Sequence, residues 1–323
     1  MFNYSIIIPH KNIPSLLRRC LNSIPNRPDL EIIVVDDNSN EETIKDLKSI
    51  HRNNLQIIYT KEGKGAGYAR NVGINNAQGK WILFADADDL FISNAFGILD
   101  KHKDSRYALI IFKSRCRNSD KLTEIGKRQN ICDSISGKIN DFQNGKIGYV
   151  ELLLGSGVPW AKMINHNFIK ENNIYFEEVR YSNDVGWNTQ IALKINNNVS
   201  VSNEEIYCWT DRSSSLYYTR NKDAFFCRFN VYYRQHLLLT ASNLPSIFNF
   251  CHFVDAAREF GILFLLKFYR TIFKEGYVIS PVYQFEKKLN LKAPYCYLFV
   301  QFVKSIFDIL FFFAPHKKKK IKF

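Results

Sequence analysis

The sequence predicts an α/β fold in which a mostly parallel, Rossmann-like central sheet is flanked by helices and followed by a helical C-terminal region. Short β-branched runs alternate with helical patterns along residues 1–113, and this alternation is typical of βαβ units. The chain has 323 residues, of which 46% are hydrophobic, so it can bury a sizeable core. We therefore expect the whole chain to fold.

The predicted strands are short apolar runs, and the segments between them carry apolar residues at helical spacing. This spacing predicts helices at 16–24 and 44–50. Asn40 is a good N-cap for the second helix, because acidic residues follow it in the first turn. The strands are predicted at residues 5–8, 31–35, 55–59, 81–85 and 107–112.

The pattern becomes less regular further along. Residues 114–146 are polar and have no sustained period, so we interpret them as a variable insertion or a mobile loop. We expect the regular pattern to resume at 147–154, followed by a strand at 158–164 and a helix at 184–194. The packing face predicted for this helix consists of Val185, Thr189, Ala192 and Leu193.

The C-terminal region, residues 216–323, is aromatic and has helical patterns. A helix at 297–313 would have a narrow polar stripe and a broad apolar face. Two charged residues near its middle argue against a membrane-spanning helix, so we expect it to lie at the membrane surface. Lysines at 317–320 would add attraction to anionic lipid. The alternative is a helix packed on the protein core, with a solvated basic tail.

The charge and the cysteines limit the classes of function. A formal net charge of +13 favours a partner that carries phosphate, such as a nucleic acid, an anionic lipid or a nucleotide. We expect no nucleic-acid partner, because the sequence lacks a basic helix with interleaved aromatic residues. The seven cysteines form no Cys-x-x-Cys pair, and no basic segment precedes the short apolar run at the N-terminus. We therefore expect a reducing, cytoplasmic location without a signal peptide.

Three carboxylates directly follow a hydrophobic strand in the segment 84–89 (FADADD). Such a group is unfavourable unless something binds it, because the charges repel one another. Mg²⁺ and Mn²⁺ take oxygen ligands and often keep substrate phosphates in their shell. Asp86 and Asp88 are therefore candidate ligands of a metal that bridges the protein to a diphosphate. For this motif taken alone, the alternative is a solvated turn or a helix N-cap.

A second acidic pair, Asp36 and Asp37, ends the second predicted strand. One acid there can accept a hydrogen bond from the imide N–H of a uracil ring while its neighbour fixes the loop. Helix capping by Asn38 or Ser39 explains part of the motif without a ligand. Because parallel strands place their following loops at one edge of the sheet, we expect this loop to meet 9–11 and the metal motif.

A glycine-rich segment, 63–73, leads into a helix that carries Arg70 and Asn71. Such segments offer backbone N–H groups and allow close approach to a phosphate or a base. A flexible surface turn is the alternative, but two donor side chains one turn into the helix favour a binding role.

Together these segments resemble the donor half of family 2 glycosyltransferases with the GT-A fold. The resemblance runs through 5–9 (SIIIP), 34–39 (VVDDNS), 67–73 (GYARNVG) and 84–89 (FADADD), in the same order and spacing. It implies an inverting transferase that takes a sugar from a nucleotide-diphosphate donor, commonly a UDP-sugar, with Mn²⁺ or Mg²⁺ as the metal.

The resemblance also implies roles for individual residues. Asp36 and Asp37 would lie at the nucleobase, and Arg70 near the base and the phosphates. Asp86 would lie near the ribose and Asp88 on the metal, which neutralises charge on the departing diphosphate. The other residues expected to contact the donor are Pro9, Gly67, Asn71, Ala87 and Arg212.

The acceptor half of this family usually carries a Glu-Asp pair before a helix, with the Asp as catalytic base. Here Asn183 stands in place of the Glu, while Asp184 is kept. One carboxylate suffices to take the proton of the acceptor hydroxyl, so Asp184 is the candidate base. The alternative for Asp184 is a helix cap.

The resemblance implies a glycosyltransferase domain at 1–215, with a donor half at 1–113 and an acceptor half at 147–215. The expected acceptor is a glycan or a lipid-linked molecule at the inner face of the cell membrane, in the synthesis of a surface polysaccharide such as a capsule, lipopolysaccharide or O-antigen. Asn183 motivates an alternative, a catalytically inactive nucleotide-binding or membrane-scaffold protein of the same fold.

Overall fold

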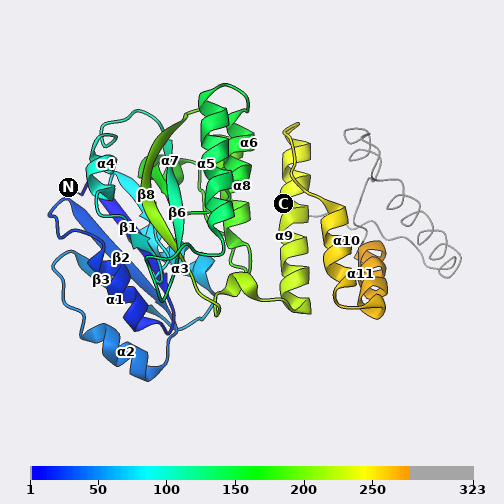
Figure 1. The fold of residues 1–323 in the computed structure, drawn as a ribbon, viewed down its shortest axis with the longest axis horizontal. Helices are drawn as coiled ribbons and strands as arrows, with labels where there is room; N and C mark the ends of the chain where they lie inside the picture. Colours follow the sequence, from blue (N-terminus) through cyan, green and yellow to red (C-terminus); the bar gives the residue numbers. More distant parts are fainter. Residues whose placement is uncertain (1, 276–323) are drawn as a thin grey trace, which may run out of the picture. The chain divides into compact units, whose positions relative to one another are not determined.

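The structure is a computed structural model that describes residues 2–275 (Figure 1). The chain divides into one compact unit that ends at Ile247 and a second that begins at Phe248. The described part of the first unit contains an eight-stranded sheet with the order β3-β2-β1-β4-β7-β6-β8-β5. The strands are β1 (Tyr4–His10), β2 (Leu30–Asp37), β3 (Leu55–Thr60), β4 (Trp81–Phe84), β5 (Leu90–Phe91), β6 (Leu109–Asn118), β7 (Lys162–Asn165) and β8 (Val199–Asp211).

The strands from the beginning of the chain form the parallel half of the sheet. β1 pairs in parallel with β2 and with β4, and β2 pairs in parallel with β3. Every residue of β2 is buried, as expected for a strand covered on both faces. The five strands predicted from the sequence are all present, and the loops after β1, β2 and β4 leave the sheet at the same edge.

The other half of the sheet is mixed. β7 is antiparallel to both β4 and β6, β5 is antiparallel to β8, and β6 runs parallel to β8. The α/β fold with a helix-flanked sheet is confirmed, but the parallel arrangement is continuous only from β3 to β4. The sequence pattern could not reveal this, because strand direction depends on how the intervening segments return to the sheet.

The helices of the first unit cover the sheet and extend beyond it. α3 packs against β1 and β2, and α5 packs against β6 and β8. The helices α5, α6 and α8 lie side by side, and α9 packs on α8 (Figure 1). The helices are α1 (Pro14–Asn22), α2 (Glu41–Lys48), α3 (Ala66–Asn76), α4 (Ala95–Asp100), α5 (Gln129–Gln143), α6 (Tyr149–Gly155), α7 (His166–Glu171), α8 (Asn183–Lys194) and α9 (Lys222–Ala241).

The prediction of an irregular insertion at 114–146 is wrong. β6 continues to Asn118, and α5 is a helix of 15 residues. Its buried residues are Cys132, Ile135 and Ile139, which lie three and four positions apart on one face. Polar and glycine residues between them diluted the pattern in the sequence.

The helix predicted at 184–194 is confirmed as α8. Three residues of its predicted packing face are buried, and Leu193 is half-buried. Trp187 and Ile191, which the prediction left out, are also fully buried. The helix is therefore covered around most of its circumference: α3, α6 and α9 pack on it, and Phe84 of β4 contacts Trp187.

The second unit contains two described helices that pack on each other, α10 (Phe250–Arg258) and α11 (Ile262–Glu275). The helix predicted at 297–313 and the lysines at 317–320 lie outside the described residues. Between residues 2 and 275, no helix has both the length and the hydropathy needed to cross a bilayer. The functional boundary expected after residue 215 stays a prediction.

Candidate active site

The loop that follows β4 holds three acids, and the most buried of them anchors the loop. Asp89 is fully buried and accepts hydrogen bonds from the Tyr207 hydroxyl at 2.8 Å and from the Thr210 backbone N–H at 2.7 Å. Burial raises the pKa of Asp89 well above its ordinary value, and repulsion by Asp88 and Asp86 adds to the rise. Both oxygens of Asp89 are occupied, so we assign it to the support of the loop.

The other two acids each meet a guanidinium group. Arg70 donates from Nη2 to Asp86 Oδ1 at 2.6 Å, and Arg212 donates from Nε to Asp88 Oδ2 at 2.5 Å. Burial raises the pKa of Asp86, Arg70 opposes this rise, and Asp88 adds to it by repulsion. The backbone N–H of Asp86 also donates to the Tyr207 hydroxyl, and this hydrogen bond holds the loop after β4 against β8.

Asp86 and Asp88 are the residues predicted to hold a divalent metal. Within residues 2–275, no group of three or more His, Cys, Asp or Glu side chains is arranged to hold one. Mg²⁺ is commonly held by one or two carboxylates, with waters and substrate phosphates completing its shell. Two carboxylates that repel each other fit such a metal when the donor supplies the remaining oxygens.

A contact that sequence reasoning missed holds this loop in place. Arg19 of α1 donates from Nη2 to the backbone carbonyl of Asp88 at 2.7 Å and from Nη1 to the carbonyl of Ser119 at 2.6 Å. The Thr210 hydroxyl donates to the same Asp88 carbonyl at 2.5 Å. Arg19 lies outside every motif of the sequence, so no local signal could have found it.

The two acids at the end of β2 have different roles. Asp36 is fully buried: its Oδ1 accepts from the Ser39 backbone N–H, and its Oδ2 accepts from the Ser39 hydroxyl and lies 2.8 Å from His10 Nδ1. Burial would raise the pKa of Asp36, but the hydrogen bonds from His10 and Ser39 outweigh it and lower the pKa. Asp36 therefore fixes the loop, as one acid of the pair was predicted to do.

One carboxylate oxygen of Asp37 is not used within the described part of the protein. Its Oδ2 accepts from the Gly65 backbone N–H at 3.0 Å and lies 3.4 Å from Lys11 Nζ, whereas its Oδ1 is buried and has no hydrogen-bond partner among the described residues. A buried acceptor without a partner is unfavourable unless a ligand donates to it. This oxygen suits the imide N–H of a nucleobase.

The helix α3, which carries Arg70, is docked tightly against the segment before α8. The Asn71 side chain donates to the Phe176 carbonyl at 2.9 Å and accepts from its N–H at 2.8 Å. A Cβ at Gly67 would lie 2.2 Å from the Glu177 carbonyl oxygen, so only glycine permits this approach. Both residues position α3, and their direct contact with a donor stays a prediction.

Two further residues expected to contact the donor lie near the carboxylates, one across the sheet and one along the chain. Pro9 belongs to β1 and pairs with Val35, one residue before Asp36. Ala87 is buried between Asp86 and Asp88. Their contacts with a donor stay predictions.

The candidate base lies at the start of α8, beside the donor side of the site. Arg70 donates from Nη1 to Asn183 Oδ1 at 2.8 Å, so one guanidinium joins Asp86 to the residue before Asp184. Asp184 has no hydrogen bond to another side chain in the described part of the protein. Burial raises the pKa of Asp184, and the charges of Arg70 and Lys162 oppose the rise. A half-buried carboxylate with a raised pKa suits a proton acceptor.

These contacts connect the predicted acids. Asp37 holds the start of α3 through Gly65, and α3 presents Arg70 to Asp86 and to the first residue of α8. Most of the residues that the sequence singled out therefore belong to one network at the carboxyl edge of the parallel strands. This is the edge at which open α/β sheets bind ligands.

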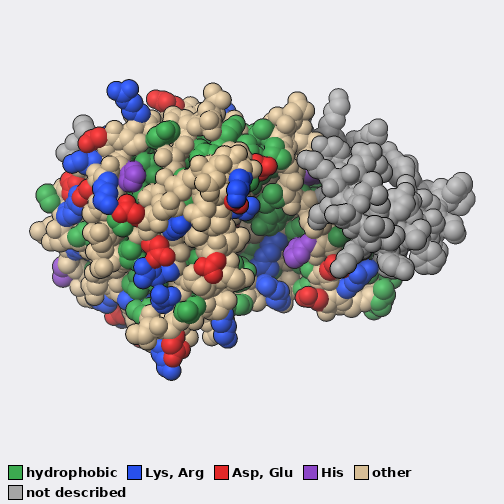
Figure 2. Space-filling view, turned by 45° about the horizontal axis from the view of Figure 1, so that its top comes forward, with side chains coloured by type: hydrophobic (Ala, Val, Ile, Leu, Met, Phe, Trp, Pro, Cys, Tyr) green, Lys and Arg blue, Asp and Glu red, His purple; other side chains and the backbone are tan. Residues whose placement is uncertain are grey.

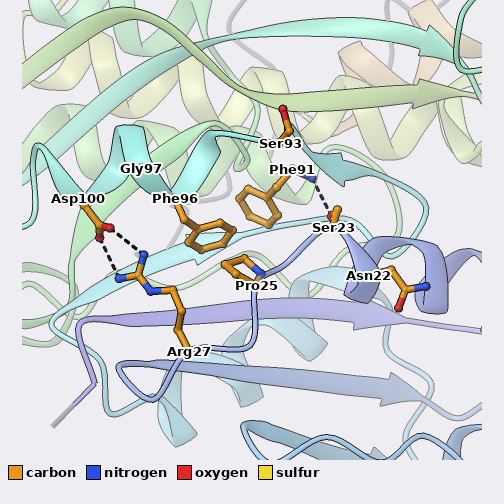
Figure 3. Close-up of a pocket in the computed structure, with 9 residues that line it drawn as sticks. All are labelled: Asn22, Ser23, Pro25, Arg27, Phe91, Ser93, Phe96, Gly97 and Asp100. Carbon is orange, nitrogen blue, oxygen red and sulfur yellow. Dashed lines mark hydrogen bonds and ion pairs between the residues drawn. The ribbon is translucent and has the colours of Figure 1, made fainter.

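A separate hollow of about 650 Å³ lies between the end of α1, β5 and α4 (Figure 3). Phe91 and Phe96 line it, and the ion pair between Arg27 and Asp100 closes one side at 2.7 Å. None of the predicted site residues lines it, so we assign it no part in the chemistry.

The face drawn in Figure 2 carries both signs of charge. Lys and Arg side chains are interspersed with Asp and Glu over the described part of this face. The positive net charge is therefore not gathered there into one basic patch of the kind that binds a nucleic-acid backbone.

The fold and the site define a class: an α/β domain in which acids at strand ends meet an arginine from a glycine-rich helix start. A family model described as Glycosyl transferase family 2 matches residues 5–162. These residues belong to that family, and the resemblance stated from the motifs is confirmed.

Two curated relatives indicate the range of the family. The poly(ribitol-phosphate) beta-N-acetylglucosaminyltransferase TarS of Staphylococcus aureus is 25% identical over 225 residues, which cover 66% of this chain and 36% of TarS. The GalNAc(5)-diNAcBac-PP-undecaprenol beta-1,3-glucosyltransferase of Campylobacter jejuni is 31% identical over 139 residues, which cover 42% of each protein. The matched part of the chain thus spans less than half of either relative.

Solved structures show the same fold. The crystal structure of S. aureus TarS 1-349 superposes with a TM-score of 0.56 at 20% identity, covering 96% of this chain and 83% of that one. The complex of TarS 1-349 with UDP-GlcNAc gives a TM-score of 0.55, covering 91% and 77%. The expected GT-A type of fold is therefore confirmed.

Proposed function

We propose that the protein is an inverting, metal-assisted glycosyltransferase that moves a sugar from a nucleotide-diphosphate donor, a UDP-sugar, to a glycan or lipid-linked acceptor. One observation carries the proposal: Arg70 bridges Asp86, on the donor side, to Asn183, which adjoins the candidate base Asp184. The names of the relatives, which are transferases acting on a poly(ribitol-phosphate) and on an undecaprenol-linked glycan, and the UDP-GlcNAc bound to TarS support it.

The donor would be held by charge and by one specific hydrogen bond. The unpaired oxygen of Asp37 accepts the imide N–H of uracil, a donor that cytosine lacks at the same ring position. Arg70 and Arg212 face the diphosphate, and a guanidinium suits its oxygens because it can donate two parallel hydrogen bonds. Arg212 would exchange the Asp88 carboxylate for the diphosphate when the donor binds.

Asp86 and Asp88 would hold the metal together with the donor. When bound, the metal supplies positive charge that stabilises the diphosphate as a leaving group. The residues of the chain do the rest: Asp89 and Arg19 fix the loop, and Arg70 balances the charge of Asp86.

Asp184 would act as the general base. It takes the proton of the acceptor hydroxyl as that oxygen forms a bond to the anomeric carbon, and the bond from this carbon to the diphosphate oxygen breaks with its electron pair going to the diphosphate. Attack from the face opposite the leaving group inverts the configuration. A carboxylate in hydrogen-bond reach of the hydroxyl supplies about 100-fold or more in rate.

The test is turnover of UDP-GlcNAc and other UDP-sugars in the presence of Mn²⁺, with free UDP as the product measured. Asp88→Ala and Asp184→Asn should abolish turnover, whereas Asp46→Asn, a change on the exposed face of α2, should leave it unaltered. If metal-dependent turnover survives in both site variants, the assigned roles are wrong.

The alternative is a catalytically inactive nucleotide-binding protein, and Asn183 in place of an acid favours it. Tight binding of UDP without transfer or hydrolysis under any condition would support that alternative. The two proteins differ in turnover, so the same assay separates them.

We further propose that the protein works at the inner face of the cell membrane, bound through its basic C-terminal tail. The lysines at 317–320 motivate this. Deleting residues 315–323 should release the protein from vesicles that contain anionic lipid, and unchanged sedimentation with the vesicles would refute the role of the tail.

A further inference from the structure

Lys162 is a buried cation that the mechanism above does not use. It is the first residue of β7, and only 1% of its surface is exposed. Its Nζ donates to the Ser156 carbonyl and to Asn188 Oδ1, each at 2.6 Å. Both acceptors are neutral, and an ammonium group without a carboxylate partner is costly to bury. A purely structural role would be filled at lower cost by an uncharged side chain.

The hydrogen bonds of Lys162 lead directly to the candidate base. Asn188 lies one helical turn after Asp184, and its Nδ2 donates to the Asp184 carbonyl at 2.9 Å and to the Gly157 carbonyl at 2.7 Å. Lys162, Asn188 and the first turn of α8 therefore form one hydrogen-bonded unit. The unit holds the ammonium at a fixed place relative to the base.

Few charged groups among the described residues lie around the unit formed by Lys162, Asn188 and the first turn of α8. Burial lowers the pKa of Lys162 to about 7, and the carboxylate of Asp184 acts in the opposite direction. Asp184 in turn feels Arg70, Asp86 and Lys162, and Tyr232 of α9 faces it. Arg70 is already engaged with Asp86 and Asn183, whereas Lys162 forms no ion pair within residues 2–275.

We propose that Lys162 is a positioning residue for the reaction: its ammonium, held by Ser156 and Asn188, keeps the half-buried Asp184 carboxylate ionised and ready to accept the proton of the acceptor. The inference rests on the proposed function, because it takes Asp184 as the base. It adds a charge from the first residue of β7 to the groups assigned above.

The test is the pH dependence of kcat/KM for UDP-sugar turnover. Lys162→Gln removes the charge but keeps an N–H donor, and Lys162→Arg keeps the charge. Lys194→Met is the matched control, since Lys194 is exposed in the last turn of α8. Circular dichroism and UDP binding check that each variant is folded.

Without the ammonium, Asp184 stays protonated to a higher pH. The Gln variant should therefore lose about tenfold more activity near pH 6 than near pH 8, because one opposite charge shifts a carboxylate pKa by about one unit or more. Near pH 8 the wild-type lysine is itself mostly neutral, so the two profiles should converge there. The Arg variant and the control should keep the wild-type profile.

A loss in the Gln variant that is uniform over pH, or an acidic limb displaced equally in the Arg variant, would overturn the proposal. Full wild-type activity of the Gln variant at every pH would do the same. These outcomes differ from failure of the proposed function, in which the wild-type protein itself shows no turnover.

Discussion

The close contact between α3 and the segment before α8 makes Gly67→Ala the sharpest test of how the site is built. An added Cβ would lie 2.2 Å from the Glu177 carbonyl oxygen and 3.1 Å from Asn183 Cβ. The first contact is about 1 Å too short for two heavy atoms, and a backbone oxygen cannot rotate away as a side chain can. Either α3 or the segment at Glu177 must shift.

Two opposing effects set the size of the change. Alanine favours the helix by about 1 kcal/mol relative to glycine. Overpacking of a well-packed site typically costs about 1–3 kcal/mol, and here the Asn71 contacts to Phe176 resist the shift. We expect a net loss of up to about 2 kcal/mol in the free energy of unfolding, with a stretched Arg70–Asn183 hydrogen bond and weaker UDP binding.

The measurement is urea unfolding together with calorimetric titration of UDP. Gly137→Ala is the matched control, because Gly137 lies inside α5 and an added Cβ there meets nothing within 4 Å. The control should be unchanged or up to about 1 kcal/mol more stable. If Gly67→Ala is as stable as the control and binds UDP like the wild type, the docking of α3 does not shape the site.

Two further predictions concern buried or paired polar groups. Tyr207→Phe leaves an oxygen of Asp89 unpaired and should lower the free energy of unfolding in urea by about 1–3 kcal/mol. Tyr107→Phe, at an exposed site, is the control and should change the stability little. Equal losses in the two variants would contradict the role of the Tyr207 hydroxyl. Arg27 lowers the pKa of Asp29 from 3.8 to about 2, so this pair stabilises the fold above pH 4 and loses its effect as the pH falls toward 2. Asp29→Asn should lower stability at neutral pH by about 1 kcal/mol and flatten that acid slope, and an unchanged slope would count against it.

The donor half of the fold was predictable because its signals are local. Buried parallel strands are continuous apolar runs, and each is followed by a polar loop of distinctive composition. The resemblance of residues 67–73 and 84–89 to one family then placed Arg70, Asp86 and Asp88 in one site. The structure connects these residues through hydrogen bonds that agree with that grouping.

The parts that escaped prediction depend on contacts between distant segments. α5 was missed because only Cys132, Ile135 and Ile139 mark its buried face among polar residues. The contact between Arg19 and the Asp88 carbonyl joins residues far apart in the sequence, as does the bond from Lys162 to Asn188. Such pairings follow from the topology of the sheet, which the sequence pattern alone did not specify.

The substitution of Asn183 for an acid acquires a physical meaning in the structure. Its amide oxygen accepts from Arg70 as a carboxylate would, but it adds no negative charge next to Asp184. A second acid there would raise the pKa of the base by repulsion. The hydrogen bond from Arg70 therefore does not require an acid at position 183.

The central claim is that the acids at the strand ends bind a uridine nucleotide. Calorimetric titration of UDP into the full chain, with Mn²⁺ present, tests it most directly, using Asp37→Ala as the site variant and Asp46→Ala as the control. We predict saturable binding that the control retains and that Asp37→Ala weakens by about 10-fold to 100-fold, the effect of losing a hydrogen bond to a charged group. Absence of binding to the wild-type protein, or equal affinity of the Asp37 variant, would contradict the claim.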